Sequence, residues 1–110
     1  MLEPQKVISE STSNGVSVCF CAQWYPNVCA LLIPEVSDAG SILVELLGSM
    51  VPDVTKAAIV ATATYTATQG TTPQKMLKPV GEWYLYYWIR LTCTTADAVI
   101  TEAYIGAGGS

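Results

Sequence analysis

The sequence has 110 residues, a length that suits one domain with one core. Its net charge is −4 with five Lys and Arg residues in total, so it lacks the clustered basic surface that nucleic-acid binding requires. Hydrophobic residues make up 51% and charged residues 13%, which excludes a disordered chain, yet no apolar run approaches the roughly 20 residues of a membrane-spanning helix.

We therefore expect a soluble domain with neither a nucleic acid nor a membrane as partner. The opening stretch, MLEPQKVISE, carries acidic residues and no apolar core, in contrast to a secretory signal peptide. A chain this apolar favours an assembly, because self-association as a dimer or trimer would bury surface that a monomer leaves in water.

Alternating patterns and β-branched residues dominate the chain, whereas helical periodicity is weak. The predicted strands cover residues 16–24, 28–33, 41–50, 59–68, 76–80, 81–93 and 98–106. Seven or eight short strands at steps of about ten residues indicate an all-β, single-domain antiparallel β-sandwich, jelly-roll-like in type. Residues 1–13 form an N-terminal arm or a first strand, 14–105 the sandwich, and 106–110 a flexible tail.

Details of these strands follow from their residues. Pro34 is expected to end the second strand, and residues 41–50 are also compatible with a helix. In the fourth strand, threonines at positions 62, 64, 66 and 68 predict a polar face. The residues that alternate with them predict an apolar face: Ile59, Ala61, Ala63, Tyr65 and Ala67. Residues 94–97 resemble a tight turn that would join the last two strands as a hairpin.

The cysteines are Cys19, Cys21, Cys29 and Cys93. None shows the paired C-x-x-C spacing of a zinc site, and neighbours two apart on one strand are poorly placed for a mutual disulfide. We expect four reduced thiols that act as small hydrophobes, and no metal. A metal, or an oxidised pair such as Cys29 with Cys93, is the alternative.

The stretch GEWYLYYWIRLTC contains five of the chain's ten aromatic residues, and it is apolar on both faces of a predicted strand. One face, with Leu85, Ile89 and Leu91, suits a sandwich interior. The other combines Tyr, Trp and Arg, the residues enriched at protein interfaces. The candidate partner-binding residues are therefore Tyr84, Tyr86, Trp88 and Arg90, with Trp24 and Tyr25 as second choices. Two alternatives remain open: coverage of this face by a loop or the N-terminal segment, and stacking on sugar rings.

Catalysis is not expected. The chain contains no His, which is the commonest general base, and it lacks the G-x-S-x-G motif of nucleophilic serines. Glu45, Glu82 and Glu102 could pair as acid and base, but such carboxylates usually form a solvated face. We predict a protein that is not an enzyme and needs no cofactor.

From residue 41 to residue 106 the sequence resembles small β-sandwich proteins of tailed bacteriophages. The resemblance rests on a strand with Gly-Ser near its end (ILVELLGS), a Thr-rich strand ending in Thr-x-Gly (TYTATQG), an aromatic strand with Arg (GEWYLYYWIRLTC) and a last Thr/Val strand (DAVITEAYIG). These features are similar to capsid decoration proteins, also called cement or staple proteins. The N-terminal third lies outside the resemblance, and GSMVPDV stands where this family would place a Trp soon after the Gly-Ser.

The resemblance implies a structural virion protein that binds the outer surface of an assembled phage capsid. It would bridge subunits of the major capsid protein and would be located on the capsid exterior, after assembly in the host cytoplasm. The alternative is a carbohydrate- or receptor-binding module of a phage tail or a similar assembly. A shell component of a bacterial compartment is a third, weaker reading.

Overall fold

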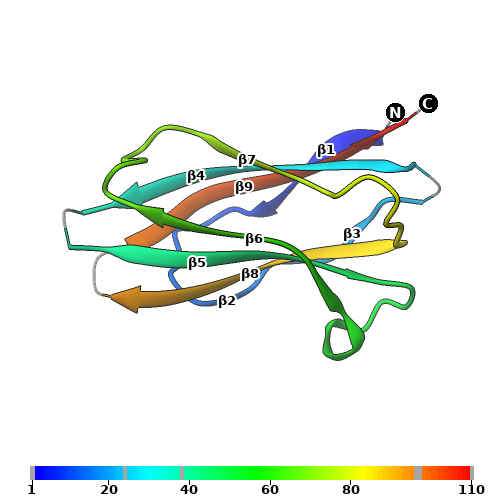
Figure 1. Ribbon diagram of the computed structural model, residues 1–110, viewed down its shortest axis with the longest axis horizontal. Helices are drawn as coiled ribbons and strands as arrows, with labels where there is room; N and C mark the ends of the chain where they lie inside the picture. Colours follow the sequence, from blue (N-terminus) through cyan, green and yellow to red (C-terminus); the bar gives the residue numbers. More distant parts are fainter. Residues whose placement is uncertain (1, 24, 38, 96–97, 110) are drawn as a thin grey trace.

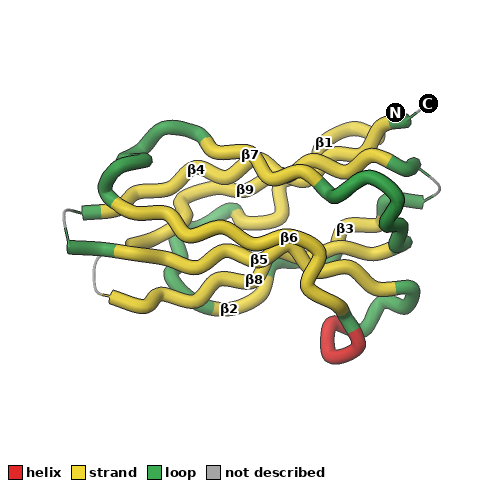
Figure 2. Tube along the Cα trace, viewed as in Figure 1, coloured by secondary structure: helices red, strands yellow, loops and turns green. Residues whose placement is uncertain are grey.

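The computed structural model describes residues 2–23, 25–37, 39–95 and 98–109, which form two antiparallel sheets packed face to face (Figures 1 and 2). Sheet A has the strand order β1-β9-β4-β7, and sheet B has the order β2-β8-β5-β6, with β3 also paired to β8. The elements are β1 (Leu2–Ile8), β2 (Gly15–Val16), β3 (Phe20–Cys21), β4 (Asn27–Val36), β5 (Ser41–Ser49), the 3-10 helix η1 (Val54–Lys56), β6 (Ala58–Thr66), β7 (Gln74–Leu77), β8 (Tyr86–Thr95) and β9 (Ala98–Gly108). The predicted all-β sandwich is confirmed.

The strand pairs are nested along the chain. β1 pairs with β9, β2 and β3 pair with β8, β4 pairs with β7, and β5 pairs with β6. This is a long antiparallel ribbon with the β5–β6 hairpin at its tip. Rolling the ribbon brings β4 against β9 and β5 against β8, which closes the two sheets. Such rolling produces the jelly-roll arrangement of two facing sheets.

The core lies between the sheets, where alternate residues of each strand point inward. Sheet A contributes mostly small and aliphatic side chains and sheet B adds aromatic ones. The buried residues of the core are Val7, Ile8, Val28, Ala30, Leu32, Val36, Met76, Ala98, Ile100, Ala103, Ile105 and Ala107 from sheet A, Phe20, Ile42, Val44, Leu46, Val60, Tyr65, Tyr87, Ile89 and Leu91 from sheet B, and Ala22, which follows β3. Of the predicted strand over residues 41–50, Ser41–Ser49 form β5, and this segment is not a helix.

A bulge lets β4 continue through a proline. Ile33 pairs with Glu102 and Pro34 with Ile100, so Thr101 is an extra residue in β9. The Thr101 hydroxyl donates a hydrogen bond to the Ile33 carbonyl over 3.1 Å. Because proline is tolerated at bulges, Pro34 lies fully buried inside β4 and does not end the strand as expected.

A second bulge changes the expected faces of β6. Leu46 pairs with Ala61 and Leu47 with Ile59, which leaves Val60 as the extra residue. Val60 is buried and Ile59 is 54% exposed, so Ile59 joins the threonine face instead of the apolar one. Sequence alternation alone does not reveal such a shift of phase.

Other expectations about the course of the chain are wrong. Residues 81–85 are not a strand, because β8 begins at Tyr86. β8 and β9 belong to different sheets and do not pair as a hairpin; residues 96–97 of the predicted turn lie outside the described residues. β9 continues to Gly108, so residues 106–108 pair with β4 and do not begin a flexible tail.

The N-terminal third also differs in detail. β1 forms a strand, which was one of the alternatives for this segment. The single strand expected over residues 16–24 is instead two short strands on β8, separated by a kink at which the N–H of Ser17 donates to the Ile89 carbonyl. Phe20 and Ala22 are buried, as an inward face requires, whereas Val16 and Val18 remain exposed.

Gly48 makes room for Tyr84 at one end of the core. A Cβ atom at this position would lie 2.6 Å from Tyr84 Cδ2 and 2.8 Å from Val60 Cγ2. The Tyr84 ring meets Tyr87 edge-on with centroids 6.1 Å apart, and the N–H of Tyr84 donates to the Tyr87 hydroxyl over 3.2 Å. Gly48 is therefore required by the close approach of an aromatic ring.

We predict that Gly48→Ala lowers the free energy of unfolding by about 1–3 kcal/mol, because the added methyl overpacks the Tyr84 ring. Urea denaturation followed by circular dichroism measures the loss. Gly106→Ala is the matched control, since a Cβ there would meet Pro4 Cγ at an ordinary 3.5 Å. Equal unfolding midpoints for the two variants would contradict the assignment.

Burial of Tyr87 predicts alkaline sensitivity. Desolvation raises the pKa of Tyr87 from 10.0 to about 12. Between these values the unfolded chain loses the phenol proton while the folded chain keeps it, so stability falls as the pH rises above 10. Urea titrations at pH 7 and pH 11 measure this slope. Tyr87→Phe should cost about 1 kcal/mol at pH 7 through the lost hydrogen bond, and it should weaken the alkaline loss. An unchanged slope would refute the prediction.

Candidate functional site

The predicted aromatic residues of β8 lie on two sides of sheet B. Tyr86, Trp88 and Arg90 share its outer face, whereas Tyr87 and Ile89 point into the core. The alternation predicted for residues 86–93 is thus confirmed. On the outer face of sheet B, the register between β5 and β8 sets the neighbour of each of these three residues. Ser49 pairs with Tyr86, Leu47 with Trp88 and Glu45 with Arg90.

Trp88 is covered within the chain itself. Its side chain is 5% exposed, and that of its neighbour Leu47 is 1% exposed. Neither belongs to the core between the sheets, so they form a small second cluster on the outer side of sheet B. The β5–β6 connection, which contains η1, contacts β5 and extends from this end of the sheet away from sheet A (Figure 1).

Arg90 is held by a carboxylate. Its Nε donates to Glu45 Oε1 over 2.8 Å, and this hydrogen bond raises the pKa of the Arg90 guanidinium. Glu45 is 8% exposed and therefore depends on this partner, whereas the Arg90 side chain is 42% exposed. The ion pair allows Glu45 to be buried, because the carboxylate keeps a charged partner, and part of the guanidinium stays accessible to solvent.

The remaining candidates lie elsewhere. Tyr84 precedes β8 and packs against the core beside Gly48, so it is not on the face of Tyr86 and Trp88. Tyr25 is partly buried against the core, in a turn closed by its N–H bonding to the Ala22 carbonyl. Trp24 lies outside the described residues.

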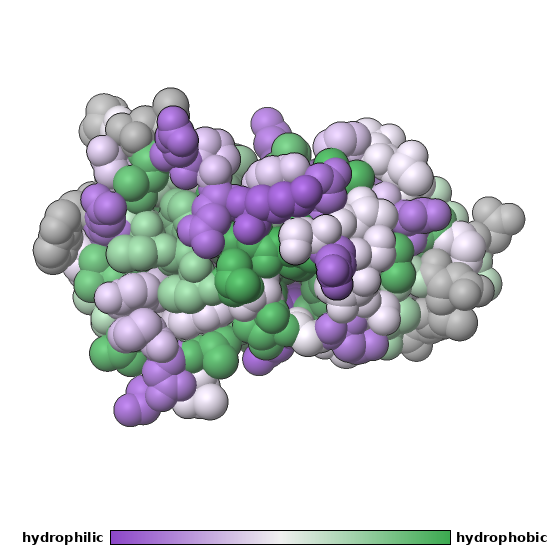
Figure 3. Space-filling model, turned by 180° about the vertical axis from the view of Figure 1, so that it is seen from behind, coloured by the Kyte–Doolittle hydropathy of each residue, from purple (hydrophilic) through white to green (hydrophobic). Residues whose placement is uncertain are grey.

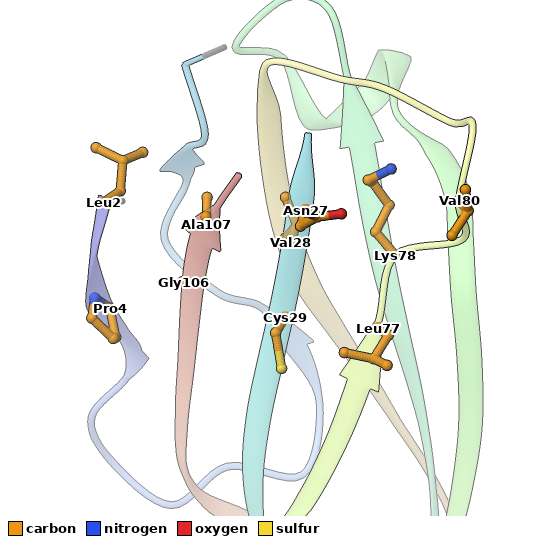
Figure 4. Close-up of a pocket in the computed structure, with 11 residues that line it drawn as sticks. Leu2, Pro4, Asn27, Val28, Cys29, Leu77, Lys78, Val80, Gly106 and Ala107 are labelled. Carbon is orange, nitrogen blue, oxygen red and sulfur yellow. The ribbon is translucent and has the colours of Figure 1, made fainter. Parts of the chain in front are cut away.

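Sheet A presents a groove that the sequence analysis missed. It has a volume of about 460 Å³ and crosses all four strands of the sheet near the start of β1 and the end of β9 (Figure 4). Leu2 and Pro4 stand on one side and Leu77 and Val80 on the other, with Cys29 between them. Leu77 is 59% exposed and Val80 is 99% exposed.

Glycines on β9 create the hollow. Gly106 occupies an outward position between Pro4 of β1 and Cys29 of β4, so the sheet has no side chain there. A second hollow of about 390 Å³ shares these three residues and continues to Leu31 and Tyr104. Together the two hollows form an open apolar groove along the outer face of sheet A.

Charged residues flank the far end of the groove. Lys6 Nζ lies 2.8 Å from Glu102 Oε1, and the Tyr104 hydroxyl donates to the same oxygen over 2.9 Å. Both hydrogen bonds lower the pKa of the Glu102 carboxyl, and the bond with Lys6 has the larger effect. The Lys6 ammonium also lies 5.8 Å from the centre of the Tyr104 ring. The cluster fixes Tyr104 as one wall of the second hollow.

Seen from behind, apolar residues gather over the half of the molecule where β1 begins and β9 ends, and a strip of polar side chains crosses between them (Figure 3). Exposed aliphatic residues of the groove and of the kink after β2 are Leu31, Leu77, Val80, Val16 and Val18. Leu77 and Val80 line the groove and Leu31 lines the hollow beside it, whereas Val16 and Val18 line a separate hollow next to Val7 and Leu91. The apolar residues that gather around the groove mark a binding site more often than scattered single residues do.

The cysteines do not assemble a reactive centre. Within the described residues the cysteines form no disulfide, and no group of three His, Cys, Asp or Glu side chains is placed to hold a metal. Cys21 and Cys29 are exposed and Cys19 and Cys93 are partly exposed, so none of the four cysteines is a fully buried hydrophobe. Cys29 lies in sheet A and Cys93 in sheet B, and the alternative pairing between them is absent. Burial raises the pKa of the Cys19 thiol, which disfavours a reactive thiolate.

Comparison with protein-family models, with curated proteins and with solved structures finds no match to this chain. In the part of the chain that the structure describes, no helix is long and apolar enough to cross a membrane. The groove and the outer face of sheet B therefore carry the functional argument.

Mutations on β8 distinguish covered from accessible residues. We predict that Trp88→Ala lowers the free energy of unfolding by about 3–5 kcal/mol, since it empties a buried site. Tyr86→Ala should cost about 1 kcal/mol or less, because Tyr86 is partly exposed. Chemical denaturation measures both, with exposed Thr92→Ala as the control on the same face. Equal losses for the two aromatic variants would overturn this distinction.

Proposed function

We propose that this chain is a structural protein of a bacteriophage particle, which binds the outer surface of the assembled capsid and bridges subunits of the major capsid protein. The proposal rests on the apolar groove of sheet A. Leu77 and Val80 leave more than half of their side chains in water, which is costly unless a partner covers them. The resemblance of residues 41–106 to capsid decoration proteins supports the same function.

The groove suits an extended apolar peptide segment. Its walls are aliphatic, and Cys29, Gly106 and Gly108 lie between them, so a partner strand would meet only small groups there and could approach closely. A sugar site needs several polar side chains that fix orientation. Here Asn27 is one of two polar side chains, and the other, Lys78, donates from its ammonium to the carbonyls of Pro79 and Glu82. These contacts favour a protein partner over a carbohydrate.

The sandwich provides two contact faces. The outer faces of its sheets point in opposite directions, so one copy can touch two neighbours at once. Sheet A offers the groove. The far side offers exposed Met50, Val51 and Ile59 around η1, with Tyr86 and Arg90 close by on the same sheet. Two modest contacts repeated over a shell would act together through multivalency.

The test is sedimentation of lysate from cells that produce this chain together with its particle, followed by mass spectrometry of the heavy fraction. We expect the chain to co-sediment in fixed ratio with a major shell protein. Leu77→Asp should reduce the bound amount by about tenfold or more, because a charge would enter the apolar groove. Val18→Asp, a change of an exposed aliphatic residue outside the groove, is the matched control.

A chain found only in the light fraction would contradict the proposal. Binding that survives Leu77→Asp would place the contact outside the groove. A change of tryptophan fluorescence with oligosaccharides, combined with absence from the heavy fraction, would favour the carbohydrate- or receptor-binding alternative.

A further inference from the structure

The sandwich has edge strands in both sheets, and most of them are protected against pairing with another chain. β1 carries Glu3, Pro4 and Lys6 and has two irregularities in its register with β9. β7 has four residues, including Lys75. β2 and β3 have two residues each. Charges, proline, bulges and short length are the usual means of blocking an edge.

β6 is the exception. It is nine residues long, from Ala58 to Thr66, and contains neither a charge nor a proline. In the described part of the chain it pairs with β5 alone, which leaves its second edge without a partner strand (Figure 1). Its bulge lies near the start, at Val60, so the six residues from Ala61 onward pair with β5 without interruption.

Threonines present their backbone N–H and C=O groups at this open edge, and the orientation of Thr66 shows which residues they are. The N–H of Thr66 donates to Gln69 Oε1 over 2.7 Å, and its carbonyl accepts from the N–H of Gln69 over 3.1 Å, so Thr66 faces away from β5. Residues of an antiparallel strand face their partner alternately. Thr64 and Thr62 therefore present their N–H and C=O groups to the same open edge.

We infer that a second copy of this chain pairs with β6, antiparallel and across a two-fold axis at Ala63. Such an axis stands perpendicular to the sheet. Side chains of residues that pair across the axis therefore lie on the same face of the combined sheet. Thr62 of one copy then lies opposite Thr64 of the other, and each such pair exchanges two backbone hydrogen bonds. The two five-stranded sheets become one continuous sheet.

The sequence of β6 is complementary to itself in this arrangement. Threonine meets threonine on the outer side, and paired β-branched residues suit adjacent strands. On the inner side Ala63 meets its own copy at the axis, where a small side chain permits close approach. No charge on β6 opposes a like charge, so nothing in its side chains prevents this pairing. The inference concerns the isolated chain and does not depend on the proposed capsid function.

Sedimentation velocity of the purified chain over a range of concentrations tests this inference. We expect reversible dimers of twice the 11.7 kDa chain mass. The variant T62K/T64K should be monomeric, because each lysine would face a lysine of the other copy. The control T71K/T72K adds the same charge in an exposed turn and should still dimerise. Circular dichroism checks that both variants keep their strands.

A second variant tests the backbone contact without adding charge. Thr64→Pro removes the N–H that faces the partner and should abolish the dimer while the fold persists. Three results would overturn the inference: a wild-type chain that is monomeric at every concentration, a dimer that survives T62K/T64K, or a Thr64→Pro chain that cannot fold because this N–H is needed by β5. A dimer in the absence of capsid binding would leave the inference intact and refute only the proposed function.

Discussion

The pairing of β5 with β8 determines both sides of sheet B. It runs from Ser41 to Ser49 along β5, and it stacks inward aliphatic residues such as Val44 and Ile89 into the core. On the outer side the same register sets Glu45 against Arg90 and Leu47 against Trp88. One half of that face is consequently ionic and the other apolar. A shift by one residue would turn the carboxylate into the core.

This register explains why an aromatic strand can be apolar on both faces. The inward aromatic, Tyr87, has its hydroxyl bonded by the N–H of Tyr84. The outward one, Trp88, is covered inside the molecule, so an aromatic stripe in the sequence does not amount to an exposed stripe on the surface. An exposed apolar groove lies instead on sheet A, where glycine leaves a hollow between side chains of β1 and β7.

The sequence allowed the fold class and most strands to be predicted, because alternation with a period of two is a local property. Bulges are less visible: Thr101 and Val60 each change the phase of a strand by one residue, and no residue type marks them. The turn after β8 could equally close a hairpin or cross between sheets, since turn chemistry does not specify which. The groove combines Pro4, Cys29, Leu77 and Gly106, which are far apart in the chain, so it could not be predicted at all. Its one local sign is Gly106, a glycine inside the last strand that falls in the stretch predicted to be a flexible tail.

Nested pairing also sets the order in which this chain can fold. β1 is complete first during synthesis, yet its partner β9 is made last, so about ninety residues must be placed before that contact can form. Pairings of such long sequence separation make folding slow, because the entropy of closing the loop is lost before the contact is gained. The β5–β6 hairpin is the local element from which ordering can start. If that hairpin orders first, its unprotected β6 edge stays open to a neighbouring nascent chain until the sandwich closes.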